Sequence, residues 1–379
     1  MGRAFEVALL RAAVRTGTAG RAWASRLDLV RSVGVKYAFH RRTEQAREKE
    51  VGTHALEVFY RRAWTEAADA LGSELIELDS GFLEIRREGA STRVWRQLTA
   101  LDEAVSLRLA LDKTLVHELL TTRGIAVPDY VEFDRADCEP ALRFMAETGG
   151  PCVVKPAKSG RGGAAVTGSV RNERHLARAT LSAARLDRRL LIERQVQGEM
   201  YRLLFLDGEL VDVVLRQAPR VVGDGKSSVV DLILRENERR LAAARPCALV
   251  TVDLDCLLCL EASGRSLRSV PAPGERVQVK SASSENSEQE NHTQRSWSPD
   301  VIDECAEAVR AIGLRLSGVD VVTPDIERPL SEAGGAIIEV NGTPGFQYHY
   351  VVADPGSATH VALPVLQRAL EEVGAARTA

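Results

Sequence analysis

The first third of the chain repeats apolar residues at helical spacing and then alternates them with polar ones. From residue 43 to residue 72 the apolar positions return every three or four residues, which predicts one or two amphipathic helices. Short segments between residues 73 and 98 alternate and predict three strands. Residues 101–124 return to the helical period. This order predicts a small α/β domain that ends near Ala110.

The middle of the chain predicts mainly antiparallel strands. Gly124 and Pro128 end the preceding helix, and residues 141–166 then predict a helix, a tight turn, a strand and a glycine-rich loop. Asp207 and Gly208 lie between two alternating apolar runs, which is a strong hairpin signal.

The last hundred residues combine one polar stretch with a regular alternation of elements. Residues 280–298 are almost entirely polar, and nothing in them favours burial as a helix or strand, so we expect a mobile loop that a ligand orders. Residues 300–316 and 360–374 predict amphipathic helices, and residues 317–326 and 334–341 predict strands between them.

Composition limits the class of protein. The 379 residues suffice for two to three domains, and a formal net charge of −3 leaves no basic excess for a nucleic acid. No run approaches the ~18 uninterrupted apolar residues of a membrane helix. Arg3, Glu6 and Arg11 interrupt the apolar core that a signal peptide would need. We therefore expect a cytoplasmic protein with no nucleic-acid or membrane partner, and we leave a homodimer open.

The six cysteines are too sparse for a disulfide scaffold, so we expect reduced, buried thiols. Cys256 and Cys259 form a single CxxC inside an apolar run, and no second Cys or His pair follows at zinc spacing. A metal or redox role for this pair is therefore disfavoured.

The strongest candidate chemistry lies on the last two predicted strands. Glu339 and Asn341 are two residues apart, so their side chains face the same way, and a neighbouring strand can bring Asp320 beside them. Two carboxylates and an amide oxygen suit Mg²⁺ that carries nucleotide phosphates. The alternative is that Glu339 and Asn341 only approach the turn at residues 342–345. Because that alternative leaves a strand ending in an acid unexplained, we favour the metal site.

A basic residue and a glycine-rich loop form a second candidate. Lys155 ends an apolar strand, and the following glycines would let backbone N–H groups approach phosphate oxygens. A solvated hairpin would look similar. The loop lies between two predicted strands and matches neither a P-loop nor a dinucleotide fingerprint, which disfavours a P-loop NTPase and a Rossmann dehydrogenase. Glu193 and Glu199 flank an extended segment typical of a hinge beside adenine, although such residues alone are more often solvated charges.

The order of these segments resembles a known family. DKTLVHELLTTRGIAVPDY, CVVKPAKSGRGG, LIERQVQGEMYR, VLRQAPRVVGDGKSSVVDLI, GVDVVTPD and IIEVNGTPGFQYH are together similar to ATP-grasp ligases of the cyanophycin-synthetase-like branch, which includes stand-alone peptide ligases. The resemblance implies an α/β (α+β) ATP-grasp fold. It implies an N-terminal pre-ATP-grasp domain (1–110), a small subdomain with the glycine-rich loop (111–190) and a C-terminal subdomain with the metal site (191–379), the last two clamping ATP.

The resemblance also implies roles for individual residues. Those expected to bind ATP are Lys113, Lys155, Ser159, Gly160, Arg161, Gly162, Gly163, Glu193, Val196 and Glu199. The expected ligands of two Mg²⁺ ions are Asp320, Glu339 and Asn341. Arg216 matches a family arginine that meets the transferred phosphoryl group together with Lys155; a surface arginine on a strand is the alternative.

Departures from the family pattern concern the ribose and the substrate. Met200 stands where the family often has an acid, which makes Glu199 a candidate for the ribose contact. The family loop rich in glycine is replaced by a run without glycine, in which Asn286 and Ser287 are candidates to meet the acyl phosphate. His349 stands where the branch commonly has histidine, and it is either a core residue or a substrate contact.

The implied function is an ATP-dependent ligase. It would activate the carboxylate of an amino acid or peptide as an acyl phosphate and pass it to an amine, which suggests a peptide or amino-acid ligase of secondary metabolism. The alternatives are a nucleotide-binding regulatory module without chemistry and an ATP-grasp enzyme that makes a non-amide product. The intact set of Asp320, Glu339 and Asn341 argues against the first alternative.

Overall fold

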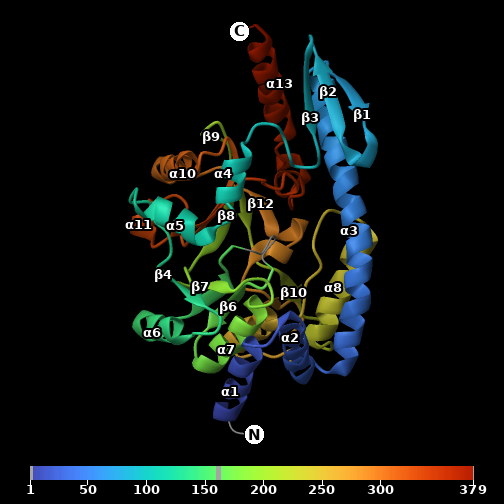
Figure 1. Ribbon diagram of the computed structural model, residues 1–379. Coiled ribbons are helices and arrows are strands. Elements are labelled where there is room, and N and C mark those ends of the chain that lie inside the picture. Colours follow the sequence, from blue (N-terminus) through green and yellow to red (C-terminus); the bar gives the residue numbers. More distant parts are fainter. Residues whose placement is uncertain (1–2, 159–163, 379) are drawn as a thin grey trace.

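Helices form the N-terminal part of the chain, and one of them runs along the side of the molecule for most of its length (Figure 1). The computed structural model describes residues 3–158 and 164–378, and for residues 3, 35–50 and 375–378 it describes the backbone alone. The helices are α1 (Arg3–Val14), α2 (Thr18–Val33) and α3 (Val35–Ala70). The helical period predicted from residue 43 is confirmed, as one long helix that begins earlier.

A small antiparallel sheet follows α3. Its strands are β1 (Glu74–Glu77), β2 (Leu83–Arg87) and β3 (Ala90–Val94), in the order β1-β2-β3, which confirms the three predicted strands. Trp64 of α3 is fully buried here, and its ring lies 5.5 Å from that of Phe346. The C-terminal helix α13 (Ala362–Thr378) packs beside α3 and β3. This sheet therefore shares a core with the end of the chain.

A second antiparallel sheet has the strand order β4-β7-β5-β6. Its strands are β4 (Tyr130–Asp134), β5 (Cys152–Pro156), β6 (Thr167–Val170) and β7 (Arg189–Arg194). Helices α6 (Glu139–Thr148) and α7 (Glu173–Ala183) share its core. The N-terminal helix α1 packs on α7, where Val7, Leu10 and Val14 meet Leu181.

The third and largest sheet has the strand order β12-β9-β8-β13-β14, with every neighbouring pair antiparallel. Its strands are β8 (Glu199–Leu206), β9 (Glu209–Arg216), β12 (Asn291–Thr293), β13 (Leu316–Thr323) and β14 (Ala336–Asn341). The predicted hairpin turn is confirmed, since Asp207 and Gly208 join β8 to β9 with φ of 51° and 83°. Such positive φ angles match the right-handed twist of a hairpin.

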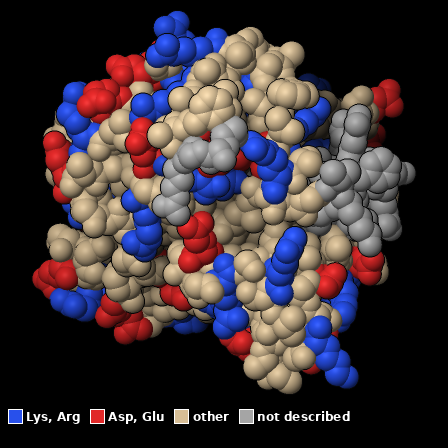
Figure 2. Space-filling view, turned by 90° about the horizontal axis from the view of Figure 1, so that it is seen from below, with Lys and Arg blue, Asp and Glu red and all other residues tan. Residues whose placement is uncertain are grey.

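The remaining elements surround these sheets. They are α4 (Ala104–Leu109), α5 (Lys113–Thr121), α8 (Val229–Ala243), α9 (Leu254–Ala262), α10 (Pro299–Ile312), α11 (Leu330–Ala333), α12 (Gln347–Tyr350) and the hairpin β10 (Arg220–Val222) with β11 (Arg276–Gln278). None of the helices within the described residues has the length and apolar content needed to cross a bilayer. Figure 2 shows basic and acidic side chains interspersed over one face, in keeping with the net charge of −3.

The expectation of a mobile loop at residues 280–298 is wrong. The segment forms two short 3₁₀ helices at 283–285 and 288–290 and then β12, which pairs with β9. Several of its buried polar side chains bond to residues distant in the sequence, as Lys280 does to Asp253 and Asn291 to the Val351 carbonyl. Burial of polar groups is tolerated when each finds a partner.

Lys280 shows how this segment is held. The side chain is 5% exposed, and its Nζ lies 2.8 Å from Asp253 Oδ1, 3.5 Å from Glu285 Oε2 and 3.9 Å from Asp255 Oδ2. Burial alone would lower the pKa of Lys280, but these carboxylates outweigh it and raise the pKa above its ordinary value. The ammonium group therefore joins the polar segment to α9 and its N-terminal turn.

Replacing Lys280 with Met is expected to lower the free energy of unfolding by about 3–5 kcal/mol, because removing one partner leaves buried carboxylates without compensation. Urea unfolding followed by circular dichroism measures this loss. Lys226 is exposed, so Lys226→Met serves as the control and should change the free energy by less than about 0.5 kcal/mol. Equal stability of the two variants would contradict the role given to Lys280.

Candidate active site

Charged side chains from the second and third sheets and from α5 converge in one region. Lys155 on β5 places its Nζ 2.5 Å from Glu193 Oε1 on the neighbouring strand β7, and both side chains are buried. Lys113, at the first turn of α5, places its Nζ 3.1 Å from Glu339 Oε1 on β14. The carboxylate of Glu193 is thus occupied by Lys155.

The candidate metal ligands meet across two strands. In the antiparallel pairing of β13 with β14, Asp320 lies opposite Glu339, and Gly318 lies opposite Asn341. Asn341 Nδ2 donates to Asp320 Oδ2 over 3.2 Å and to the Gly318 carbonyl over 3.3 Å, so the amide nitrogen and not the oxygen meets Asp320. The structure therefore brings together all three side chains at one end of the strand pair.

This set is one that Mg²⁺ would accept, since all its donor atoms are hard oxygens. The described residues contain no cluster of three or more His, Cys, Asp and Glu side chains suited to a metal. An ion here would accordingly depend on the amide oxygen of Asn341 and on ligand oxygens in addition to the two carboxylates. Burial raises the pKa of Glu339, but Lys113 and Lys155 outweigh it and hold that pKa below its ordinary value, so the carboxylate is ionised.

Arg202 on β8 is a part of the site that sequence reasoning missed. Its Nε and Nη2 donate to Asp320 Oδ1 and Oδ2 over 2.6 and 2.8 Å, and both side chains are buried. Planar bidentate pairing of this kind orients the carboxylate as well as neutralising it. The available signal was a basic residue inside the apolar run YRLLFL.

Arg216 at the end of β9 is the second buried arginine. It is 3% exposed, so the alternative of a surface strand arginine is wrong. Its guanidinium carbon lies 3.7 Å from the ring centre of Tyr348, and Nη2 donates to the Ser283 carbonyl over 3.2 Å. Nε has no hydrogen-bond partner, and within the described part of the chain no carboxylate forms an ion pair with this side chain. A buried cation left in this state favours an anionic ligand.

The other candidates occupy varied positions. Glu199 is half-buried, with its Oε1 3.9 Å from Arg220, and Val196 is half-buried in the segment between β7 and β8. Residues 159–163, which include the predicted phosphate loop of Ser159, Gly160, Arg161, Gly162 and Gly163, lie outside the described residues. Met200 contacts Ser283 Oγ through its sulfur.

The three substrate candidates are buried. Ser287 is a helix cap that donates to Glu290 Oε2 over 2.7 Å. Asn286 bonds to Asn291 and lines a cavity. His349 is fully buried, its Nδ1 lies 2.7 Å from Asp212 Oδ2, and burial outweighs this acid and lowers its pKa. His349 therefore has the surroundings of a core histidine.

Comparisons with known proteins identify relatives of this chain. Residues 119–223 match the family described as the C-terminus of D-ala D-ala ligase. The chain is 29% identical over 316 residues to cyanophycin synthetase of Nostoc sp., which covers 80% of this chain and 34% of that protein. It is 31% identical over 289 residues to cyanophycin synthetase of Synechocystis sp., covering 72% and 32% of the two chains.

A solved structure shares the arrangement of the elements. The bifunctional glutathione synthetase from Pasteurella multocida superposes with a TM-score of 0.53 at 24% identity, over 89% of this chain and 47% of that one. The chain is an ATP-grasp protein. Its relation to the cyanophycin-synthetase-like branch and its ATP-grasp fold, both predicted from the order of the segments, are confirmed. This ATP-grasp chain spans about a third of the length of the cyanophycin synthetases, 34% of that from Nostoc sp..

His117 on α5 makes the stability of this region depend on pH. The ring is 1% exposed, and its Nδ1 lies 3.6 Å from Glu193 Oε1, beyond hydrogen-bonding distance. Burial lowers its pKa to about 4, while the nearby acid opposes that shift. Between this value and the ordinary pKa of about 6.5, the unfolded chain binds more protons than the folded one. Stability must therefore fall as the pH falls through this window.

We expect the protein to lose about 2 kcal/mol more stability between pH 7 and pH 5 than the variant His117→Gln, because glutamine does not titrate. Urea unfolding of both proteins at the two pH values gives the difference. The other histidines are present in both proteins, so their contributions cancel. An identical pH dependence would show that His117 is not held neutral by the fold.

Proposed function

We propose that this ATP-grasp protein is a ligase that joins a carboxylate to an amine with ATP. The proposal is supported by its relation to cyanophycin synthetases and to glutathione synthetase. The observation that carries it is the buried Arg216, which lacks a carboxylate partner among the described residues and lies, like the Arg202 that pairs with Asp320, over the ring of Tyr348. Such a group favours an anion, and a transferred phosphoryl group has the charge and the planar oxygens that a guanidinium binds best.

The reaction would begin with phosphoryl transfer. An oxygen of the substrate carboxylate attacks the γ-phosphorus of ATP, the bond to the bridging oxygen breaks, and ADP leaves. Lys113, Lys155 and Arg216 stabilise the charge on the transferred group, chiefly by positioning and electrostatics. Asp320, Glu339 and Asn341 would hold one or two Mg²⁺ ions, which supply further positive charge to the phosphate oxygens. The amine nitrogen then attacks the acyl carbon, phosphate leaves, and the nitrogen loses a proton to form the amide.

The ion pairs suggest how the charges of the site are balanced before ATP binds. Each acid near the phosphates already has a basic partner, as in the pairs of Lys155 with Glu193 and of Lys113 with Glu339. When phosphates enter, the basic groups can turn to them while Glu339 turns to the metal. We further propose that the segment at Val196 lies against adenine and that Glu199 contacts the ribose.

The ligase proposal is tested by ADP release with Mg-ATP and the twenty standard amino acids as carboxylate substrates, with hydroxylamine as the trapping nucleophile. We expect hydroxamate with at least one carboxylate. Glu339→Gln should reduce the rate by at least about a hundredfold, since it removes a charge from the metal ligands and the partner of Lys113. ATP binding without ADP release for every carboxylate would support a nucleotide-binding module instead.

The role of Arg216 is tested by the variant Arg216→Lys. It keeps the charge but loses the planar donors, so we expect kcat for hydroxamate formation to fall by about 10²–10³-fold with little change in KM for ATP. Arg93→Lys is the matched control, because Arg93 is exposed on β3 in the first sheet, and it should remain near the wild-type rate. Similar rates for both variants would remove Arg216 from the reaction.

A further inference from the structure

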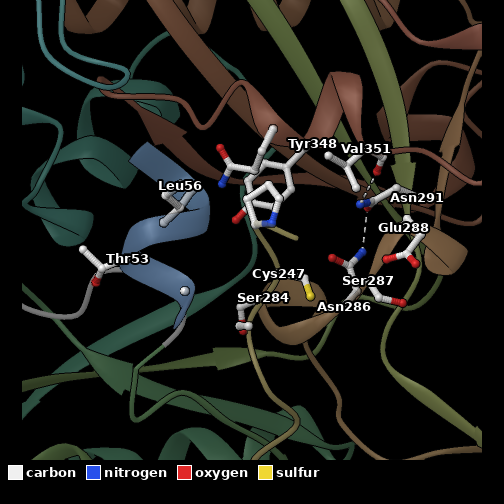
Figure 3. A pocket seen from close by; sticks show the side chains of 14 residues that line it. Thr53, Leu56, Cys247, Ser284, Asn286, Ser287, Glu288, Asn291, Tyr348 and Val351 are labelled. Atoms are coloured by element: carbon white, nitrogen blue, oxygen red, sulfur yellow. Dashed lines mark hydrogen bonds between the residues drawn. The ribbon is translucent and has the colours of Figure 1, made fainter. Parts of the chain in front are cut away.

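A cavity of about 320 Å³ lies between the long helix α3, the polar segment and α12 (Figure 3). This volume is at the lower end of the range for small-molecule sites, about 300–1,000 Å³. Its lining includes Gly52 and Leu56 of α3, Asn286 and Asn291 of the polar segment, and Tyr348 and Val351. The proposed roles of the ATP site account for none of its apolar residues.

The cavity adjoins the proposed phosphoryl site through one aromatic ring. Tyr348 lines the cavity and is also the ring over which the Arg216 guanidinium lies at 3.7 Å. Asn291, another lining residue, pairs with Arg216 in the register of β12 and β9. A molecule in the cavity is therefore one side chain away from the group proposed to meet the transferred phosphate.

A buried hydrogen-bond acceptor without a partner marks the cavity wall. Asn291 Nδ2 donates to the Val351 carbonyl over 3.2 Å, which turns Asn291 Oδ1 toward Asn286. Asn286 Nδ2 donates to this oxygen over 2.8 Å and to the Gln217 carbonyl over 3.2 Å. The orientation of the Asn286 amide is thus fixed, and Figure 3 shows its oxygen on the side away from Asn291. Asn286 is 4% exposed, and this oxygen has no partner within the described residues.

An unpartnered amide oxygen calls for an N–H donor, since leaving a buried acceptor unbonded is costly. The lining also limits the rest of the ligand. Leu56 and Val351 offer contacts to an aliphatic body. The acid in the lining, Glu288, already lies 3.3 Å from Arg239 and 3.6 Å from Arg245.

We propose that this cavity binds the amine substrate, as an aliphatic amine whose N–H is accepted by Asn286 Oδ1. The inference rests on the proposed ligase function and adds the substrate class and its location. Helix α3 contributes one wall, so the N-terminal part of the chain takes part in selecting the amine.

Gly52 on α3 is a suitable position at which to test whether the cavity binds the amine. A Cβ added to it would meet nothing within 4 Å, and its backbone is ordinary helix. Gly52→Leu should therefore fill the cavity without disturbing the fold, and Gly52→Ala is the matched control. Replacing glycine in a helix raises helix propensity, so neither variant should melt below the wild type. Leucinamide is a suitable probe, because it has an aliphatic body and no carboxylate and can act only as the amine.

With the carboxylate that gives hydroxamate, we expect Gly52→Leu to raise KM for leucinamide by about tenfold or more, a loss typical of a pocket altered by a few carbon atoms. KM for ATP and the rate of hydroxamate formation should not change, since hydroxylamine needs no shaped pocket. For Gly52→Ala, KM for leucinamide should stay within about twofold of the wild-type value.

Other outcomes overturn the inference in distinct ways. A loss of hydroxamate formation in Gly52→Leu with unchanged KM for leucinamide would place the carboxylate substrate in the cavity. No change in any constant would show that neither substrate enters it. If the wild type forms no hydroxamate at all, the ligase proposal fails, and calorimetry with leucinamide then decides alone: binding that Gly52→Leu abolishes supports an amine site, and no binding to the wild type refutes it.

Discussion

The buried ion pair between Arg202 and Asp320 is the interaction on which the centre of the molecule depends. Its two short hydrogen bonds fix β8 against β13 and aim Asp320 toward Asn341 on β14. Room for the guanidinium exists because position 318 is glycine, where a Cβ would lie 2.9 Å from Arg202 Nη1 and 3.0 Å from Pro344. A buried pair of this kind adds little to net stability but permits few alternative arrangements. The ion pair between Arg202 and Asp320 therefore contributes both to the register of the strands and to the orientation of the candidate metal ligands.

The elements were largely predictable because their signals are local. The apolar alternation around Asp320 and Glu339 predicts strands, the Asp207-Gly208 pair predicts their neighbouring hairpin, and strand periodicity places Glu339 and Asn341 on one face. The convergence of these residues followed from that periodicity together with the family resemblance. Arg202 could not be assigned in this way, because its partner is 118 positions away in the sequence.

The polar segment at 280–298 shows where local reasoning fails. Its composition alone predicts exposure, yet Lys280 and Asn286 are buried because α9, β9 and β12 supply their partners. The composition of a segment indicates how much free energy it costs to remove its polar groups from water. The tertiary structure determines whether hydrogen bonds and ion pairs offset that cost. The cavity wall at Asn286 was hidden from the sequence for the same reason, since only the bonded amide nitrogen reveals that its oxygen is left free.

The packing of the N-terminal helices depends on one backbone angle. Helix α1 is attached to α7 beside the second sheet, whereas α3 is attached to α13 and to the core around Phe346. Helix α2 is attached to α7 as well, since Arg178 Nε donates to Asp28 Oδ2 over 2.9 Å. The chain therefore leaves the side of the second sheet at Gly34, whose φ is 88°, and enters α3 there. Glycine adopts such a φ at little cost, so this one residue allows two consecutive helices, α2 and α3, to belong to two different packing units.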